Sequence, residues 1–256
     1  MQDDQLERIR AAARLLKNSR YTVVFTGAGI STPSGIPDFR SANTGLWQTN
    51  DPMLVASMTT FTYHPDRFYR WLRPLLQSST QALPNPAHHA IATLEKNGRV
   101  QAVITQNIDN LHQKAGSGNV IKLHGSMDSF HCPACHLAGE NAPSLIEEIL
   151  AGLIPYCSHC GAIMKPDIIL YEEALPVQAW QAASDAVARA EVMIVAGSSL
   201  EVIPASSLPY DAYRCGCRVI IVNLSPTYMD PLAEVVISGD VSEALPMILE
   251  ETLVED

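Results

Sequence analysis

The chain has 256 residues, 47% of them hydrophobic, with a net charge of −10 and a pI of about 5.2. This length and composition exclude a disordered chain and predict one large domain over residues 1–256, because enough apolar side chains are present to form a substantial core. The acidic balance offers no broad cationic surface, so we expect no nucleic-acid partner. Every apolar run is far shorter than a membrane span, so we expect no membrane partner either.

The N-terminal segment predicts a helix and not a secretion signal. Residues 1–20 carry acids where a signal peptide would be basic, and they contain no continuous apolar region. Leu6, Ile9, Ala13 and Leu16 recur at helical spacing, which indicates an amphipathic helix. We therefore expect a cytoplasmic protein.

Short apolar runs, each followed directly by polar residues, recur along the chain. Residues 21–26 read as a buried strand that stops at a Gly-Ala-Gly turn, and a helix with Asn85 as its cap and Gly98 at its end comes next. Further strands are predicted at 100–105, 120–123, 192–196 and 218–222, and a last helix after Asp240. This alternation predicts an α/β fold: a Rossmann-like parallel sheet with helices on both faces, whose ligands gather at the carboxyl ends of the strands.

Two segments interrupt the alternation, residues 41–83 and 128–165. The first is rich in aromatic residues, and the second contains four of the six cysteines. We interpret both as excursions from the sheet within the single domain.

The paired cysteines predict one structural zinc ion. Cys132 and Cys135 form one C-x-x-C pair, and Cys157 and Cys160 form a second one 21 residues later. Two such pairs supply four thiolates to a tetrahedral Zn²⁺ and leave no position for a reacting water. A redox C-x-x-C, or a Cys₃His site that uses His131 or His159, is the alternative. Cys215 and Cys217 are interpreted as ordinary thiols.

The glycine turn at residues 27–29 has two interpretations. A strand followed by Gly-Ala-Gly begins a dinucleotide fingerprint, in which small residues let backbone N–H groups approach a pyrophosphate. The third glycine of that fingerprint is replaced by Thr32. A tight strand-to-helix turn explains the same residues equally well.

The motifs after this turn decide between the two interpretations. GAGISTPSGIPDFR at 27–40 is followed in order by TQNID at 105–109, LHG at 123–125, the cysteine pairs, KPDIILYEE at 165–173, GSSLEVIP at 197–204 and VNLS at 222–225. Over residues 10–250 the chain resembles the sirtuin family of NAD-dependent protein deacylases. The resemblance implies that residues 41–83 are a helical, cofactor-loop insertion and residues 128–165 a zinc-binding module, which together form a small zinc-ribbon and helical subdomain. The resemblance implies an enzyme that consumes NAD as co-substrate and removes acyl groups from lysine in proteins or peptides. Its products would be nicotinamide, free lysine and O-acyl-ADP-ribose.

The resemblance also implies roles for individual residues. His124 would be the general base, since a neutral imidazole can take a proton from a ribose hydroxyl, and Asn107 would share the catalytic site. The implied NAD-binding residues are Gly27, Ala28, Gly29, Thr32, Asp38, Phe39, Arg40, Gln106, Ile108, Asp109, Gly197, Ser198, Ser199, Asn223, Leu224, Ser225, Asp240 and Val241.

Some of these residues also have structural interpretations. Asp38 would cap a turn, Asp109 would cap the helix after it, and Phe39 would be a core residue or a shield for the reacting ribose. His88, His89 and His112 lack any motif and are interpreted as surface or packing residues.

The substrate segment is expected at Ile169, Leu170 and Tyr171, with Val202 on the other side of the peptide. These residues would pair with the peptide backbone by strand addition, which makes few demands on sequence. Glu172 stands where the family usually has glycine, and we expect its charge to favour cationic peptides. Leu72 and Leu75 occupy the positions where related enzymes for acidic acyl groups carry Tyr and Arg, so we expect neutral acyl groups; both leucines would otherwise be helix core.

Two other outcomes remain open at this point. The same residues would serve mono-ADP-ribosyl transfer or NAD hydrolysis, and a non-catalytic NAD-sensing module is a third class. An ordinary NAD oxidoreductase is disfavoured because the third glycine and an acidic ribose-binding residue are missing. We expect a monomer.

Overall fold

A six-stranded parallel sheet is the centre of the first of two units. The structure is a computed structural model that describes residues 2–38, 45–139 and 141–254. The first unit comprises residues 1–34, 83–123 and 177–256. Its strands are β1 (Thr22–Thr26), β2 (Ala102–Thr105), β3 (Val120–Lys122), β6 (Val192–Ala196), β7 (Arg218–Asn223) and β8 (Val235–Ser238).

The strand order is β3-β2-β1-β6-β7-β8, and all neighbours are parallel. The connections therefore run outward in opposite directions from β1, which makes the carboxyl ends of β1 and β6 a topological switch point. Val24 pairs with Val103 of β2 on one side and with Ile194 of β6 on the other. The glycine turns that follow β1 and β6 thus start from adjacent strands.

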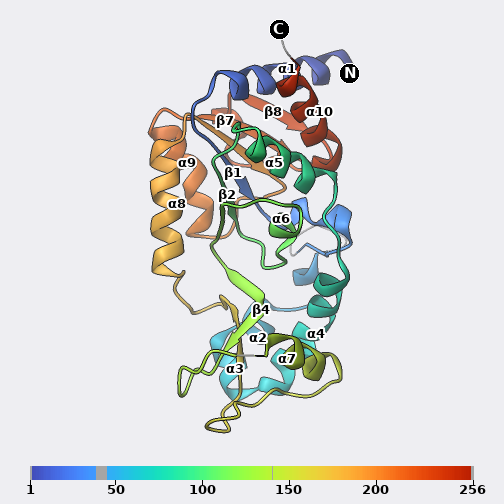
Figure 1. The fold of residues 1–256 in the computed structure, drawn as a ribbon, viewed down its shortest axis with the longest axis vertical. Helices are drawn as coiled ribbons and strands as arrows, with labels where there is room; N and C mark the ends of the chain where they lie inside the picture. The colour runs from blue at the N-terminus through green and yellow to red at the C-terminus, as the bar shows by residue number, and fades with distance from the viewer. Residues whose placement is uncertain (1, 39–44, 140, 255–256) are drawn as a thin grey trace. The chain divides into compact units, whose positions relative to one another are not determined.

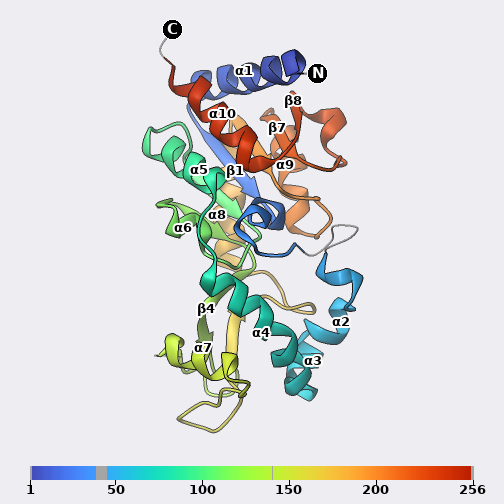
Figure 2. The same ribbon diagram turned by 90° about the vertical axis from the view of Figure 1, so that its right-hand side faces the viewer.

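Helices cover both faces of this sheet. They are α1 (Gln2–Asn18), α5 (Pro86–Lys96), α6 (Leu111–Lys114), α8 (Val177–Arg189), α9 (Leu208–Arg214) and α10 (Val241–Leu253). Short 3₁₀ turns occur at Ala28–Ile30, Thr32–Ser34, Ala205–Ser207 and Asp230–Leu232. In Figure 1, α8 and α9 flank one face, whereas α1, α5 and α10 flank the other. Figure 2 shows α10 between α1 and α5.

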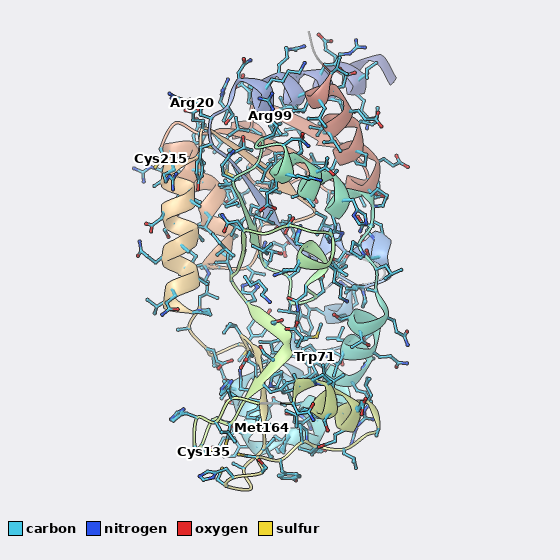
Figure 3. All side chains as sticks on the ribbon, in the orientation of Figure 1. Arg20, Trp71, Arg99, Cys135, Met164 and Cys215 are labelled. Atoms are coloured by element: carbon cyan, nitrogen blue, oxygen red, sulfur yellow. The ribbon has the colours of Figure 1, made fainter. Side chains whose placement is uncertain are left out.

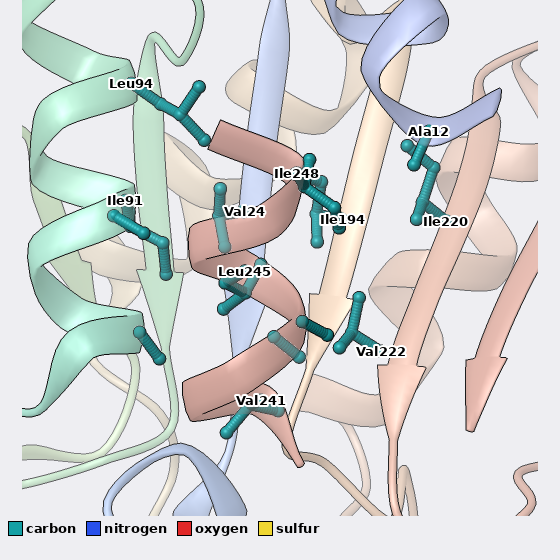
Figure 4. Packing of buried hydrophobic residues seen from close by; sticks show 14 of the residues in the cluster. Ala12, Val24, Ile91, Leu94, Ile194, Ile220, Val222, Val241, Leu245 and Ile248 are labelled. Carbon is teal, nitrogen blue, oxygen red and sulfur yellow. The ribbon is translucent and has the colours of Figure 1, made fainter. Parts of the chain in front are cut away.

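Alternate residues of the strands supply two separate cores. Val24, Ile194 and Ile220 pack with α1, α5 and α10, whereas their neighbours Phe25, Val195 and Ile221 pack with α8 and α9. Period-two alternation places successive side chains on opposite faces, and both faces are apolar because helices cover both. Leu245 of α10 is fully buried among Val24, Ile91 and Ile248 (Figure 4).

The second unit comprises residues 35–82 and 124–176. It contains α2 (Pro52–Val55), α3 (Met58–Tyr63), α4 (Pro65–Gln81), α7 (Ala142–Leu150), the 3₁₀ turn Leu46–Gln48, and the antiparallel strands β4 (Gly125–His131) and β5 (Lys165–Ile168). Phe61, Phe68 and Tyr69 form edge-to-face contacts in its core. The Tyr69 hydroxyl donates to the Met164 carbonyl just before β5, and burial raises the pKa of Tyr69.

The expected fold class is confirmed, with two additions. Sequence patterns did not predict β8, a four-residue edge strand, or the β4–β5 pair, which begins at Gly125. The two interrupting segments, 41–83 and 128–165, fall almost entirely in the second unit. Among the described residues, no helix is both long and apolar enough to span a membrane.

Replacing Leu245 by alanine should lower the free energy of unfolding by about 2–5 kcal/mol, because the sheet and α5 cannot close the cavity completely. Met247 lies on the same helix and is 40% exposed, so Met247→Ala is the matched control with a loss below about 1 kcal/mol. Urea unfolding followed by circular dichroism measures both. Equal losses for the two variants would contradict the assigned core.

Candidate functional site

The turns after β1 and β6 touch through their backbones. The Gly29 N–H donates to the Gly197 carbonyl at 2.8 Å, and Gly27 N–H donates to the Ala196 carbonyl at 3.3 Å. A Cβ on Gly29 would lie 2.8 Å from the Gly197 oxygen, and one on Gly197, at φ +61°, would lie 2.3 Å from the Ile30 nitrogen. Glycine is therefore required here by the approach of one turn to the other.

The backbone donors of this turn are largely used within the protein. Besides Gly27 and Gly29, the Ile30 N–H donates to the Gly27 carbonyl and the Ser31 N–H to the Ala28 carbonyl. These four donors are not free for a pyrophosphate, which differs from the usual role of such a turn. The tight-turn interpretation thus explains the glycines by itself, and a ligand at this edge would rely on other groups.

Asn107, Ser31 and Asp109 form a buried chain of hydrogen bonds beside the turn. The Asn107 Nδ2 donates to the Gly27 carbonyl at 3.0 Å and to Ser31 Oγ at 3.1 Å. Ser31 Oγ in turn donates to Asp109 Oδ2 at 2.6 Å. Both hydrogens of the Asn107 amide are therefore committed, and its oxygen is left as the group that can face a ligand.

Asp109 is a buried carboxyl group with two roles. Its Oδ1 accepts the Leu111 N–H at 2.9 Å at the start of α6, although the N-cap position of this helix is Asn110 and not Asp109. The residue is only 6% exposed, and burial raises its pKa against the hydrogen bonds from Ser31 and Leu111, which lower it. A carboxyl group with a raised pKa at the carboxyl edge of a parallel sheet is typical of functional sites.

Two histidines lie under this edge, fully buried. Thr26 Oγ1 donates to Thr105 Oγ1 at 2.9 Å, so His112 Nε2 at 3.0 Å is the donor to Thr26. Thr105 Oγ1 also accepts the Asn107 N–H, which links this pair to the Asn107 chain. The rings of His88 and His112 are 4.9 Å apart. Both are therefore buried polar residues, while the neighbouring His89 is exposed as expected of a surface residue.

Burial keeps both histidines neutral. It lowers the pKa of His88 to about 4, helped by His89, and the pKa of His112 to about 3, helped by His88. His88 Nδ1 accepts the Asn85 N–H in the cap of α5, so protonation there would break the cap. A proton on His112 Nδ1 would have no partner among the described groups.

The other expected NAD-binding residues of the first unit line the same sheet edge. Gln106 Nε2 donates to Ser198 Oγ, and Thr32 Oγ1 donates to the Gly29 carbonyl. Asn223 Nδ2 donates to the Ser225 carbonyl after β7, and Asp240 caps α10 through both the N–H and the hydroxyl of Ser242. The remaining residues differ in exposure: Ser199 and Leu224 are exposed, Ala28 and Ile108 are half-buried, and Val241 is buried.

The GIPDFR motif leads into the second unit. The Asp38 carbonyl accepts the Leu46 N–H at 3.0 Å. Phe39 and Arg40 lie outside the described residues, so their expected roles stay predictions.

His124 stands at the start of β4 in the second unit, directly before a glycine with positive φ. A Cβ on Gly125, at φ +77°, would lie 1.8 Å from the Asp167 carbonyl oxygen, so only glycine fits. The His124 carbonyl accepts the Ile169 N–H at 3.0 Å. The LHG motif therefore fixes the backbone of His124 against the segment that follows β5.

The expected peptide segment is already hydrogen-bonded within the second unit. The N–H groups of Ile169, Leu170 and Tyr171 donate to the His124 carbonyl, Glu173 Oε2 and the Ala56 carbonyl. The Leu170 and Tyr171 carbonyls each accept an internal N–H as well, from Glu173 and Met58, so most backbone groups of this segment already have a partner within the unit. Val202, on the other expected side, is half-buried in the first unit.

Glu172 and the two leucines have clear positions. The Glu172 carboxylate accepts the N–H and the hydroxyl of Thr59 at 2.8 and 3.0 Å. Leu72 and Leu75 of α4 are buried, as their helix-core interpretation predicted, and Leu75 lines a cavity of about 350 Å³ with Trp71 and Arg70. Figure 3 labels Trp71 in this part of the unit.

The four clustered cysteines fit a tetrahedral zinc ion. Their Sγ atoms all lie within 4.8 Å of one another, with Cys132 and Cys160 at 3.5 Å and Cys135 and Cys157 at 3.6 Å. Zn–S bonds of about 2.3 Å at tetrahedral angles require sulfur atoms about 3.8 Å apart. None of the four forms a disulfide. Cys135 lies in the loop after β4 (Figure 3).

The loops favour the thiolate at the first cysteine of each pair, whereas the neighbouring sulfur atoms raise the pKa of Cys135 and Cys160. The backbone N–H of Cys135 lowers the pKa of Cys132 to about 6, and the backbone N–H of Cys160 lowers the pKa of Cys157. Each C-x-x-C turn thus directs an N–H at its own first sulfur, which stabilises the charged form that binds metal. The donor set and its spacing therefore fit a closed, structural zinc site.

Comparison with known proteins identifies the family. The model of the Sir2 family matches residues 27–204. A relative from Archaeoglobus fulgidus named NAD-dependent protein deacylase 2 is 46% identical over 96% of both chains. The chain belongs to the Sir2 family. A structure described under "Structural Basis for the Mechanism and Regulation of Sir2 Enzymes" has a TM-score of 0.90 at 46% identity, and covers 96% of this chain and 98% of its own.

A second Sir2 structure holds a deacetylated p53 peptide and 3′-O-acetyl ADP ribose. It has a TM-score of 0.88 at 41% identity, and the match covers 93% of this chain and 96% of that one. The motif-based resemblance to the sirtuin family is thereby confirmed.

Several residues of this Sir2 chain that build the sheet edge escaped the motif analysis. Ser31, Thr26, Thr105 and His112 have no sequence pattern of their own, but each is a polar residue in or directly beside a motif. Lys165 is only 2% exposed in the second unit and pairs with Glu173 at 2.9 Å. A lysine and a glutamate at the two ends of the KPDIILYEE motif are the signal that would have indicated this pair.

Cys132→Ser should remove bound zinc and unfold the second unit, since three thiolates and a hydroxyl hold the ion far less tightly. Metal analysis and tryptophan fluorescence measure the two effects; Trp47 and Trp71 both belong to that unit. Cys215→Ser, in the first unit, is the control and should keep one zinc per chain. Full zinc retention by Cys132→Ser would contradict the site.

The free energy of unfolding should fall as the pH drops from about 6.5 to 4. In this window the unfolded chain protonates both histidines while the folded chain keeps His88 and His112 neutral, so their contribution to stability is full above pH 6.5 and is lost toward pH 4. His112→Gln should lower the slope by up to one proton, or about 1.4 kcal/mol per pH unit. Urea unfolding at several pH values measures it. The slopes should coincide near pH 8; an unchanged slope at pH 5 would contradict the burial of His112 as a neutral ring.

Proposed function

We propose that this chain is an NAD-dependent protein-lysine deacylase, with acetyl-lysine as its typical substrate. The observation that carries the proposal is the buried Asn107–Ser31–Asp109 chain at the switch point, in a protein that matches a named NAD-dependent deacylase over 96% of its length. NAD supplies a labile bond to nicotinamide, whose departure lets the acyl oxygen attack the ribose. The acyl group leaves the lysine nitrogen for a ribose hydroxyl with the consumption of one water molecule, and the products are nicotinamide, free lysine and O-acyl-ADP-ribose.

In this proposal the sheet edge of the first unit holds NAD. Asn107 presents its amide oxygen, because both amide hydrogens are bound to Gly27 and Ser31. Gln106, Ile108 and Asp109 border the nicotinamide, and Ser198, Ser199, Asn223, Leu224, Ser225, Asp240 and Val241 serve the adenosine half. Gly27, Ala28, Gly29 and Thr32 shape the phosphate end, with Asp38, Phe39 and Arg40 supplied by the next segment. Because glycine has no side chain, a phosphate can approach the backbone of this turn closely even where the N–H groups are already hydrogen-bonded.

His124 acts as the general base in the proposed reaction. A neutral imidazole accepts the proton of a ribose hydroxyl and returns it later, and the Gly125 backbone fixes where this side chain starts. The peptide lies along Ile169, Leu170 and Tyr171, and along Val202. Four thiolates close the zinc shell, so the ion stabilises the second unit and takes no part in the reaction.

The proposal also covers the location, partners and oligomeric state of the enzyme. The N-terminal segment forms the amphipathic helix α1, which packs against α10, and this supports a cytoplasmic protein. Proteins and peptides with neutral acyl-lysine are the proposed partners, and a monomer is the proposed state.

Mass spectrometry after incubation with NAD and an acetylated peptide tests the proposal. We expect nicotinamide release to require the acetylated peptide and O-acetyl-ADP-ribose to form. His124→Ala should fold and retain zinc but lose more than about 99% of turnover, in line with the usual effect of removing a general base. His89 is exposed, so His89→Ala is the control and should keep the wild-type turnover. Nicotinamide release without acetylated peptide would indicate hydrolysis or ADP-ribosyl transfer, and no NAD consumption would indicate a non-catalytic module; either result overturns the proposal.

A further inference from the structure

Glu172 adopts a backbone conformation that glutamate rarely takes. Its φ is +77°, in the left-handed region that favours glycine. The side chain is held in place: Glu172 Oε2 accepts the Thr59 N–H at 2.8 Å, and Oε1 accepts the Thr59 hydroxyl at 3.0 Å. A strained residue persists where surrounding contacts fix it, and here both contacts come from one residue at the start of α3.

The residue before Glu172 is joined to the same part of the chain. The Tyr171 N–H donates to the Ala56 carbonyl at 3.0 Å, and the Met58 N–H donates to the Tyr171 carbonyl at 3.1 Å. Ser57 and Tyr171 thereby form an isolated parallel bridge. Residues 56–59 and 171–172 therefore form one small clamp within the second unit, and Glu172 provides its side-chain contact.

The other end of the segment is fixed by a buried ion pair. Lys165 Nζ lies 2.9 Å from Glu173 Oε2 and donates to the Ile168 carbonyl at 2.8 Å. Glu173 Oε2 also accepts the Leu170 N–H. Ile169 is also held by the His124 carbonyl, so Tyr171 is the residue of this segment whose position depends on the contacts with residues 56–59.

We propose that Glu172 is a positioning residue that holds Ile169–Tyr171 in the shape that receives the acyl-lysine peptide. This rests on the proposed function. The carboxylate keeps Tyr171 in register with residues 56–58, so the segment is already ordered before the peptide arrives. Ordering a loop in advance strengthens binding because less conformational freedom is lost on association. The expected effect is on peptide binding and not on the chemical step.

The position of the carboxylate separates this role from charge recognition. We expected from the sequence that Glu172 favours cationic peptides, which requires the charge itself. Holding the clamp together requires only two atoms of residue 172 that hydrogen-bond to Thr59, one to its N–H and one to its hydroxyl. Glutamine supplies both without the charge, since its amide oxygen accepts the Thr59 N–H and its amide nitrogen can donate to the Thr59 hydroxyl.

The test uses the zinc-loaded full chain, one acetyl-lysine peptide with basic flanks and one with neutral flanks. Glu172→Gly removes both hydrogen bonds to Thr59 without backbone strain, since glycine readily adopts this φ. It should raise the KM for both peptides about five- to tenfold, the usual effect of losing two hydrogen bonds, with kcat and the KM for NAD within about twofold. Glu172→Gln should have the wild-type KM for both peptides. Thr59→Val, which keeps the N–H but loses the hydroxyl, should have a KM between those of the wild type and Glu172→Gly. Glu147→Ala in α7 is the control for loss of one exposed negative charge.

Hydrogen exchange of the Thr59 and Tyr171 amides gives a readout that does not need activity. Both should exchange faster in Glu172→Gly and at the wild-type rate in Glu172→Gln. Unchanged exchange and an unchanged peptide KM in Glu172→Gly would overturn the proposal. A KM raised by Glu172→Gln for the basic peptide alone would also overturn it, in favour of charge recognition. An inactive wild-type chain would contradict the proposed function. The amide exchange rates of Thr59 and Tyr171 would still decide whether Glu172 holds the clamp together.

Discussion

The contact between Gly29 and Gly197 is the constraint on which the rest of the sheet edge depends. Because β1 and β6 are neighbours at the point where the strand order reverses, their two turns must pass each other at backbone distance. The Gly27 carbonyl can then accept from Asn107, and Ser198 can accept from Gln106. One close approach thus brings polar groups from three strand ends together.

The polar groups under this edge explain why it is rigid before any ligand binds. Thr26, Thr105 and Asn107 share hydrogen bonds, and Ser31 connects Asn107 to the Asp109 carboxyl. A buried network in which nearly every donor has an acceptor holds a single arrangement, because each alternative leaves a polar group without a partner. Its exceptions are His88 Nε2 and His112 Nδ1, which lack partners; His88 stays neutral because its Nδ1 accepts the Asn85 N–H, and His112 because a proton on Nδ1 would have no acceptor.

The sequence predicted the parallel sheet, α5 with its Asn85 cap, and the cysteine cluster, since these follow from short apolar runs that alternate with helices, capping chemistry and C-x-x-C spacing. It did not predict β8, which is a short edge strand, or the burial of His112, which depends on partners far away in the chain. The tight strand-to-helix turn was one of the two interpretations of residues 27–29, and the internal hydrogen bonds of Gly27, Gly29, Ile30 and Ser31 agree with it; the expected role of the turn in NAD binding stays a prediction. Motifs identify residue types that belong together; only coordinates tell which donors are already used.

The most direct measurement of the central claim compares Gly197→Ala with Gly216→Ala by urea unfolding. Both glycines have positive φ, but a Cβ at 216 meets nothing within 4 Å, whereas one at 197 would lie 2.3 Å from a backbone nitrogen. We predict a loss of about 1–2 kcal/mol for Gly216→Ala from conformation alone. For Gly197→Ala we predict a loss greater by ~3 kcal/mol or more, because the two turns must separate. Equal losses for the two variants would contradict the account.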